Sequence, residues 1–175
     1  YHPKPKPRRN LGFTIAFEDK HLLVVEKPAE LLTVPTRRQE TNTLLHKVDT
    51  YVRHVSKGRG AFSVHRLDRG VSGLLVFGKS PEMVRKLQDQ FAASKPEREY
   101  VAIVAGQMER KQGTFETLLA TDKDLNRFST EDESIGQLAI THFRVVARLD
   151  GATLVQVPAK APVPAITGTR LRAAS

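Results

Sequence analysis

The stretch of residues 61–79 constrains the fold of this chain more than any other. Two apolar runs, each long enough for a β-strand, flank a charged turn that holds one carboxylate, Asp68, among His65, Arg66 and Arg69. A chain gains no stability by gathering these ionisable side chains between two buried strands. A carboxylate in such a turn is therefore either tied down by the neighbouring guanidinium groups or used as a reagent. The stretch alone leaves both interpretations open.

Two strands are predicted before this turn. Residues 13–17 alternate with the period of a half-buried strand, and residues 21–26 form an apolar run that predicts a buried strand. The second strand is expected to end at Lys27-Pro28, because proline cannot donate to a sheet ladder. We expect Lys27 to be an exposed lysine at the end of this strand.

Two segments predict helices. The first has one apolar stripe, with Asn42 or Thr41 as its expected cap, at positions 44, 45, 48, 51, 52 and 55. The second begins with Ser80, Pro81 and Glu82, which supply a hydroxyl cap, a proline at the first helical position and an acid in the first turn. Its expected buried face consists of residues 83, 84, 87 and 91.

The second half of the chain predicts mainly strands. Residues 99–106 and 114–119 are strand candidates, and residues 121–136 are polar enough to predict an exposed connection. Residues 138–157 alternate on both sides of Asp150-Gly151, which is a strong hairpin signal. The expected fold class is α+β, with a mixed, mainly antiparallel sheet and flanking helices.

The length and composition fit one globular domain. The chain has 175 residues, of which 39% are hydrophobic and 27% charged. Residues 1–10 alternate basic residues with proline and predict an extended arm. We expect one catalytic domain over residues 11–157. Residues 158–175, where proline and alanine show no periodicity, are expected to form a disordered or unrelated tail.

The charge balance narrows the class of partner. Lys and Arg number 28 against 19 Asp and Glu, and the net charge of +9 favours nucleic acid first and an anionic membrane second. A basic protein kept soluble by its charge is the other interpretation. Cysteine is absent, which excludes disulfides and thiolate metal sites. No apolar run approaches the roughly 20 residues that span a bilayer, and the first residues lack the apolar core of a secretory signal, so we expect a cytoplasmic protein.

Four segments carry motifs that occur together, in this order, in one enzyme family. The longest is His65-Arg66-Leu67-Asp68, followed by Ser72-Gly73-Leu74-Leu75-Val76 and Lys79. The other three lie at residues 19–29, 98–106 and 139–143. With these segments the chain resembles the RluA family of RNA pseudouridine synthases, from about Ile15 to Val157, and the longest is similar to the family's signature for its catalytic aspartate.

The resemblance implies isomerisation of uridine to pseudouridine in rRNA or tRNA, without a cofactor or a metal ion. Asp68 would be the catalytic aspartate, which either adds covalently or abstracts a proton. Arg66 matches an arginine that enters the RNA as the base leaves or pairs with phosphate, and Tyr100 matches a tyrosine that holds the base. Arg69 and His65 complete the expected substrate-binding set, with a structural hydrogen bond as the other interpretation of His65. The expected partner is structured RNA, with no membrane and no obligatory protein partner.

Three departures from the family pattern bear on this expectation. Glu30 stands where the family usually has glycine, and Gly70-Val71 replace a common Asp-Thr. After residues 154–157 the family continues with Thr-Gly-Arg-x-His-Gln-Ile-Arg, which supplies a basic partner for the aspartate, whereas here a Pro- and Ala-rich segment follows. We therefore expect a C-terminally truncated or altered member whose activity is reduced or lost.

An RNA-binding module with the same fold but no catalysis is the alternative function. An aspartic protease would need a second carboxylate in an equivalent loop, and no similar motif recurs in the sequence.

Overall fold

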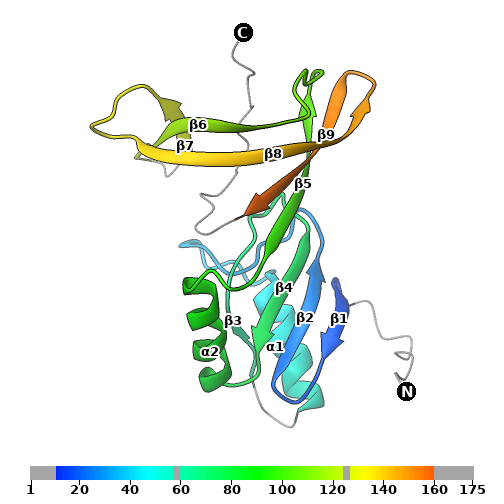
Figure 1. Ribbon diagram of the computed structural model, residues 1–175. Coiled ribbons are helices and arrows are strands. Elements are labelled where there is room, and N and C mark those ends of the chain that lie inside the picture. The colour runs from blue at the N-terminus through cyan, green and yellow to red at the C-terminus, as the bar shows by residue number, and fades with distance from the viewer. Residues whose placement is uncertain (1–10, 57–59, 124–126, 160–175) are drawn as a thin grey trace. The chain divides into compact units, whose positions relative to one another are not determined.

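The computed structural model describes residues 11–56, 60–123 and 127–159 (Figure 1). The chain divides into two compact units, Tyr1–Ala93 and Ser94–Ser175, and each has its own sheet. The arm at residues 1–10 and most of the tail that we expected at the C-terminus lie outside the described residues.

The described residues of the first unit form one four-stranded sheet. Its order is β1-β2-β4-β3, and every neighbouring pair is antiparallel. The central pair, β2 (Leu22–Lys27) and β4 (Gly73–Gly78), is in register from Leu22 opposite Gly78 to Lys27 opposite Gly73. The outer strands are β1 (Thr14–Glu18) and the short β3 (Phe62–Ser63). Residues 64–72 therefore form a loop at the end of the sheet where β2 stops.

Helix α1 (Leu44–Val55) packs its apolar stripe into the core of the first unit. Four of its side chains are buried, together with Leu23, Val25, Leu75 and Phe77 of the sheet. The expected cap at Thr41 or Asn42 is wrong, because Thr43 is the N-cap and its hydroxyl accepts the amide of His46. Thr43 also forms an isolated parallel β-bridge with Leu32, and this pairing fixes where the helix begins.

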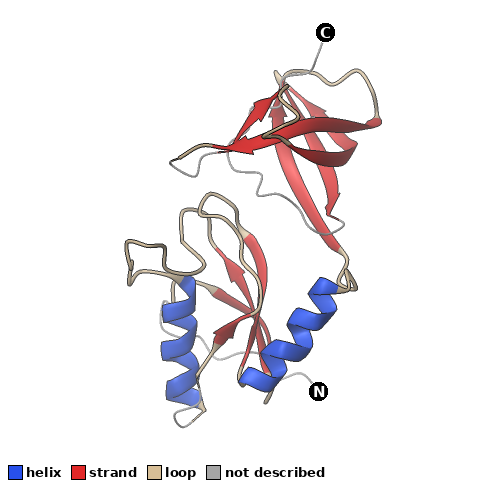
Figure 2. Cartoon of the chain, turned by 90° about the vertical axis from the view of Figure 1, so that its left-hand side faces the viewer, coloured by secondary structure: helices blue, strands red, loops and turns tan. Residues whose placement is uncertain are grey.

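Helix α2 (Pro81–Ala92) begins as the sequence predicts, with Ser80 as its N-cap and Pro81 in the first turn. Its apolar face is less enclosed than expected, since none of its residues is fully buried. Gly78 lets the helix approach the sheet, because a Cβ at this glycine would lie 2.6 Å from Cγ2 of Val84. Figure 2 shows the two helices on opposite sides of the sheet.

The second unit is a sheet of antiparallel strands in the order β5-β9-β8-β6-β7. The predicted hairpin is confirmed as β8 (Gln137–Leu149) and β9 (Ala152–Ala159), with Gly151 at a positive φ of 66° in its turn. β5 (Arg98–Ala105) pairs with β9, and β6 (Gln112–Thr121) pairs with β8. A cluster of Phe143, Val155 and Val157 forms the core of this unit.

Two expectations for the second unit are wrong. The exposed connection predicted over residues 121–136 contains a strand, β7 (Arg127–Thr130), which pairs with the end of β6. This edge strand is short and mostly exposed, so it has no apolar alternation to reveal it. Strand β9 also continues through Pro158, which lies opposite Glu99 of β5. Its ladder with β8 reaches only Gln156, so on that side the missing proline amide interrupts no pairing.

Candidate active site

The loop between β3 and β4 presents Asp68 at the surface of the first unit. The carboxylate side chain is 17% exposed, and its Oδ1 lies 3.6 Å from Nη2 of Arg66, whose own side chain is largely exposed. The amide of Val71 donates to the carbonyl of Asp68 at 3.1 Å and closes the turn. The carboxylate thus lies near the guanidinium group of Arg66 and remains partly exposed.

Thr33 holds the loop directly before Asp68. The buried hydroxyl of Thr33 donates to the carbonyl of Leu67 at 2.6 Å and accepts its amide at 3.1 Å. A single side chain therefore satisfies both backbone groups of the residue that precedes the carboxylate. This fixes the direction in which the Asp68 side chain leaves the backbone.

Lys27 holds the loop directly after Asp68, and here the sequence-based expectation is wrong. The residue is 0% exposed rather than an exposed strand-end lysine. Its Nζ donates to the carbonyls of Pro28, Leu31 and Arg69 at 3.0, 2.6 and 3.1 Å. Burial lowers the pKa of this ammonium below its ordinary value of 10.5, while the charges of Glu30 and Asp68 act in the opposite direction. The loop after the carboxylate is therefore tied to β2 and to residues 28–31 by one buried cation.

The alternation of β2 contains the signal that was missed. Leu23, Val25 and Lys27 are two residues apart, so they point to the same face of the strand. Since Leu23 and Val25 belong to the core, Lys27 must point inward as well. The same rule applies to Leu75, Phe77 and Lys79, and Lys79 is buried against Glu18 at 2.9 Å.

His65 makes contacts that support the loop. Its Nε2 accepts the amide of Val76 at 3.3 Å, and its ring stacks on Phe91 of α2, with 4.6 Å between ring centroids. The hydroxyl of Ser63 donates to the carbonyl of His65 at 2.9 Å. These contacts agree with the structural interpretation of His65, and its role in substrate binding stays a prediction.

The connection between β2 and α1 also interacts with the Asp68 loop through charged side chains. Glu40 accepts the amide and the hydroxyl of Thr36 at 2.9 Å. These hydrogen bonds lower the pKa of the Glu40 carboxyl, and the positive charge of Arg69 adds to the effect. Arg69, an exposed residue of the carboxylate loop, therefore also interacts through its charge with this connection.

Glu30 occupies a backbone position that favours glycine. Its φ is +65°, in the left-handed region, which explains why the family pattern usually has glycine there. The Glu30 carboxylate approaches the loop after Asp68, since its Oε1 lies 3.9 Å from where a Cβ of Gly70 would stand. This chain thus places an additional acid near its candidate active site.

The structure brings His65, Arg66, Asp68 and Arg69 together in one loop of the first unit and places Tyr100 in the second. Tyr100 is half-buried near the start of β5, opposite Val157 of β9, and packs against the core cluster of that unit. Its place near the start of a strand agrees with the prediction.

The charges on the described residues are close to balance. These residues hold 19 of the 28 Lys and Arg and 18 of the 19 Asp and Glu. The chain's excess of positive charge therefore falls mainly in the segments outside the described residues. Within the described residues, local groups of side chains decide where phosphate is attracted.

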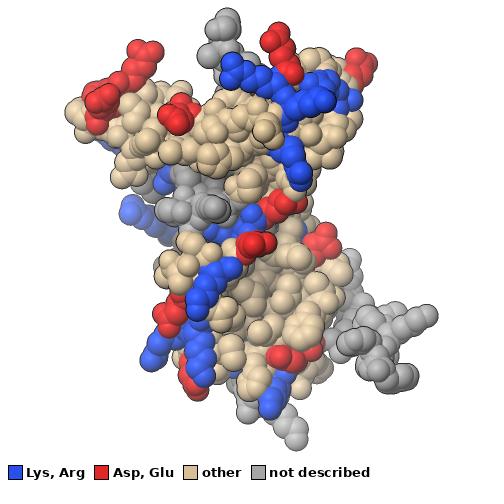
Figure 3. All heavy atoms as spheres, in the orientation of Figure 1, with Lys and Arg blue, Asp and Glu red and all other residues tan. Residues whose placement is uncertain are grey.

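In the second unit, the turn between β7 and β8 is acidic, whereas the hairpin end carries side chains of both signs. Glu131, Asp132 and Glu133 are exposed in the turn between β7 and β8, and Figure 3 shows acidic side chains gathered at that end of the sheet. Arg110, Lys111 and Arg148 are exposed at the hairpin end together with Glu109 and Asp150, and Figure 3 shows side chains of both signs there.

The α+β fold and the anchored, surface-facing carboxylate define a candidate active site rather than a buried structural ion pair. The family model for RNA pseudouridylate synthases matches residues 21–160, which include every strand and helix from β2 to β9. The chain belongs to this family. Within the described residues, no helix is long and apolar enough to cross a membrane.

Relatives and solved structures agree with this assignment. The chain is 32% identical to "Ribosomal large subunit pseudouridine synthase D" of Zymomonas mobilis, over 88% of this chain and 51% of that protein. It is 33% identical to "Dual-specificity RNA pseudouridine synthase RluA" of Haemophilus influenzae, over 85% of this chain and 64% of that protein. The chain thus spans about half to two thirds of the length of these relatives. The fold is similar to that of human RNA pseudouridylate synthase domain containing 4, with a TM-score of 0.70 and 19% identity over 86% of this chain and 60% of that one.

Proposed function

We propose that this chain carries the nucleophile-bearing part of an enzyme that isomerises uridine to pseudouridine in RNA. Family membership supports the class of reaction, and the anchored Asp68 supports the position of the reacting group. The name of one relative, a ribosomal large subunit pseudouridine synthase, supports rRNA as a substrate, whereas tRNA as a substrate and the cytoplasm as the site of action stay predictions.

The reaction exchanges one bond of the sugar for another without oxidation or reduction. The bond between C1′ of ribose and N1 of uracil breaks, the base turns, and C1′ forms a bond with C5. The proton on C5 leaves to water, and N1, which has lost its bond to the sugar, takes up a proton from water. The Asp68 carboxylate serves this exchange either by adding covalently to the nucleoside or by taking up a proton. Besides water, the exchange as proposed uses only the protein and the RNA.

The observation that carries the proposal is the way the loop is held on both sides of Asp68. Thr33 fixes the backbone of Leu67, and Lys27 fixes the carbonyl of Arg69, while the carboxylate between them remains partly exposed. A reacting group must be held in position and still reach its substrate. A carboxylate that only stabilised the fold would need no such anchors on both of its neighbours.

The remaining predicted residues take roles around this carboxylate. Arg66 and Arg69 are exposed and can pair with RNA phosphates, since guanidinium groups bind phosphate in bidentate geometry. Tyr100 would stack on the extruded uracil, whose removal from the RNA stack costs a few kcal/mol. His65 would act through the loop that it supports.

The test is release of tritium from RNA labelled at C5 of uridine. We expect Asp68→Asn to reduce release at least about 100-fold, the lower end of what a positioned acid or base contributes, while RNA affinity stays nearly unchanged. Asp89→Asn is the matched control, because Asp89 is an exposed aspartate on α2. Equal release by the wild type and Asp68→Asn would refute the role of Asp68.

The RNA-binding module remains the second candidate, and one sequence observation favours it. Residues 160–175 do not carry the Thr-Gly-Arg-x-His-Gln-Ile-Arg pattern of the family. A wild-type chain that binds RNA but releases no tritium would support this second function.

A further inference from the structure

A hollow of about 430 Å³ lies at the end of the first unit's sheet that is remote from Asp68. It is lined by Lys20, His21, Gly60, Phe62, Lys79, Ser80 and Pro81. The register explains why these residues meet, because Gly78 at the end of β4 pairs with both Leu22 and Phe62. The amide of Lys79 also donates to the carbonyl of His21 at 2.8 Å. The hollow is therefore built by the sheet and does not depend on one mobile side chain.

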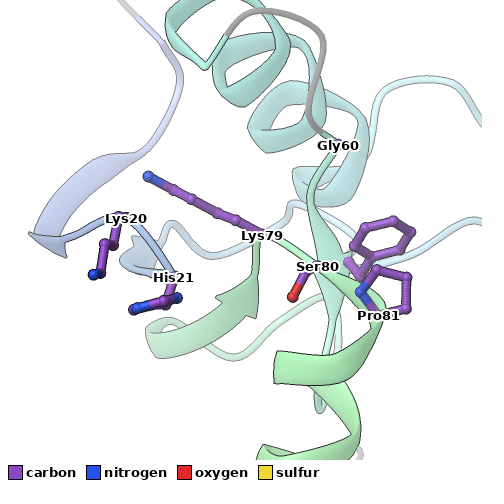
Figure 4. A pocket seen from close by; sticks show the side chains of 7 residues that line it. Lys20, His21, Gly60, Lys79, Ser80 and Pro81 are labelled. Carbon is purple, nitrogen blue, oxygen red and sulfur yellow. The ribbon is translucent and has the colours of Figure 1, made fainter.

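One side of the hollow is basic, and the fold does not require its charges. Lys20 and His21 are exposed, and Figure 4 shows them on the side away from Ser80 and Pro81. The charge that the fold uses is that of Lys79, whose Nζ donates to Oε1 of Glu18 at 2.9 Å and to the carbonyl of Asp19 at 2.6 Å. Figure 4 shows this side chain directed away from Pro81.

Two carboxylates lie near His21, and both are already engaged. Asp19 accepts the amides of His21 and Leu22 at 2.7 and 2.8 Å, which lower the pKa of its carboxyl. Glu82 pairs with Lys86 at 2.7 Å. The start of α2 is likewise occupied by its Ser80 cap, so an anion would be held by the Lys20 and His21 side chains and not by the helix end.

The other side of the hollow offers an aromatic surface. Phe62 is 41% exposed although it belongs to a strand. Gly60 lies beside the ring, since a Cβ there would be in van der Waals contact with Cζ of Phe62 at 3.7 Å. An exposed ring that faces the side chains of Lys20 and His21 across a hollow matches a nucleotide, whose base stacks on the ring while its phosphate contacts these two side chains.

We propose that this hollow binds a single-stranded nucleotide of the same RNA whose uridine reaches Asp68. The inference rests on the proposed function. β4 separates the two sites by five residue steps, or about 17 Å at roughly 3.3 Å per step. This distance corresponds to about five nucleotides of a stacked strand at roughly 3.4 Å each. The nucleotide in the hollow would extend the contact with RNA beyond the reacting uridine and so contribute to the choice of substrate.

The experiment compares two RNAs and two phenylalanines. We expect Phe62→Ala to weaken binding of a long RNA with single-stranded flanks by about tenfold, within the range that loss of one stacked base produces. A short RNA that covers only the uridine and its immediate neighbours should bind equally to Phe62→Ala and to the wild type. Phe17→Ala is the matched control, because Phe17 is a 53% exposed phenylalanine of the same sheet that does not line the hollow.

Two further variants and a competition experiment can refute the inference. Phe62→Leu retains an apolar side chain in β3 and tests stacking if the alanine variant does not fold. Lys20→Gln should lower the salt dependence of long-RNA binding by about 0.7 in the slope of log K against log salt, the value for one phosphate of a single strand. Competition by free uridine monophosphate at the affinity of the long RNA would show a site for a free nucleotide and overturn the inference.

The outcomes separate this inference from the proposed function. If Phe62→Ala and Phe62→Leu bind the long RNA as the wild type does, the hollow is no RNA site, and the proposed function stands. If the wild type binds neither RNA, both fall. Tritium release from the short RNA should be the same for Phe62→Ala and the wild type, since the ring is remote from Asp68.

Discussion

Replacing Lys27 by methionine should destabilise the first unit although it exchanges a charged residue for an apolar one of similar length. The ammonium donates to three carbonyls, at distances between 2.6 and 3.1 Å, in a position without exposure. A hydrogen bond from a charged group contributes about 1.5–3 kcal/mol, and a buried carbonyl left without a donor costs about 1–3 kcal/mol. Removing the buried ammonium group recovers part of this free energy, because burial disfavours its charged form. We expect a net loss of about 3 kcal/mol in the free energy of unfolding.

Urea unfolding measures this loss directly. At a slope of about 2 kcal/mol per molar, the midpoint of Lys27→Met should fall by about 1.5 M. Lys86→Met is the matched control, because this lysine is exposed on α2 and its pair with Glu82 contributes little. An unchanged midpoint for Lys27→Met would refute the reasoning, since it would show that the three carbonyls need no donor.

The pH dependence gives the Lys27 prediction a second readout. The pKa of Lys27 is lowered in the folded protein, so between that lowered value and 10.5 the unfolded chain binds more protons. Stability of the wild type relative to Lys27→Met should therefore rise as the pH increases through this window. A difference in unfolding free energy that falls over the same range would contradict burial as the cause of the shift.

Three further substitutions test other parts of the first unit. Glu30→Gly should raise the free energy of unfolding by about 1 kcal/mol in a urea titration, because φ is +65° there; Glu30→Ala keeps the strained backbone and should give no gain. Gly78→Ala should lower it by about 1–3 kcal/mol, since the new methyl group would meet Cγ2 of Val84 at 2.6 Å, whereas Gly70→Ala, with 3.9 Å to its nearest neighbour, should unfold as the wild type does. Asp19→Asn should lose stability at neutral pH because two amides lower the pKa of this carboxyl. That loss is complete above the ordinary value of 3.8 and should vanish as the pH falls through the lowered pKa, so an unchanged difference in unfolding free energy at low pH would contradict it.

The sequence predicted most elements of the fold because their signals are local. Ser80 and Pro81 define the start of α2 within one turn, and Asp150-Gly151 defines the hairpin of β8 and β9. The cap of α1 was misplaced because three successive polar residues can each act as a cap. Thr43 is selected by a bridge to Leu32, eleven residues earlier, and this pairing is a tertiary contact that no local pattern contains.

In the candidate site, too, the sequence predicts what is local and misses contacts between distant residues. Asp68 and its charged neighbours are contiguous, so the sequence could identify their loop. The groups that hold this loop, Thr33 and Lys27, come from more than 30 residues away in the chain. Lys27 could have been recognised as buried from the alternation of β2, but its partners could not, because carbonyl groups carry no sequence signature.

The contacts described here that anchor the Asp68 loop come from the first unit alone. Thr33, Lys27, Ser63 and Val76 all precede residue 94, so these anchors belong to the same unit as the carboxylate. On the proposed function, the two units then contribute to different steps. Substitutions at Thr33 or Lys27 would displace the reacting group and lower the maximal rate. Substitution of Tyr100 or a change in the segment after β9 would affect how the uracil is held and how its charge is balanced. A chain altered after β9 could therefore retain a correctly placed Asp68 and bind RNA while turning it over slowly.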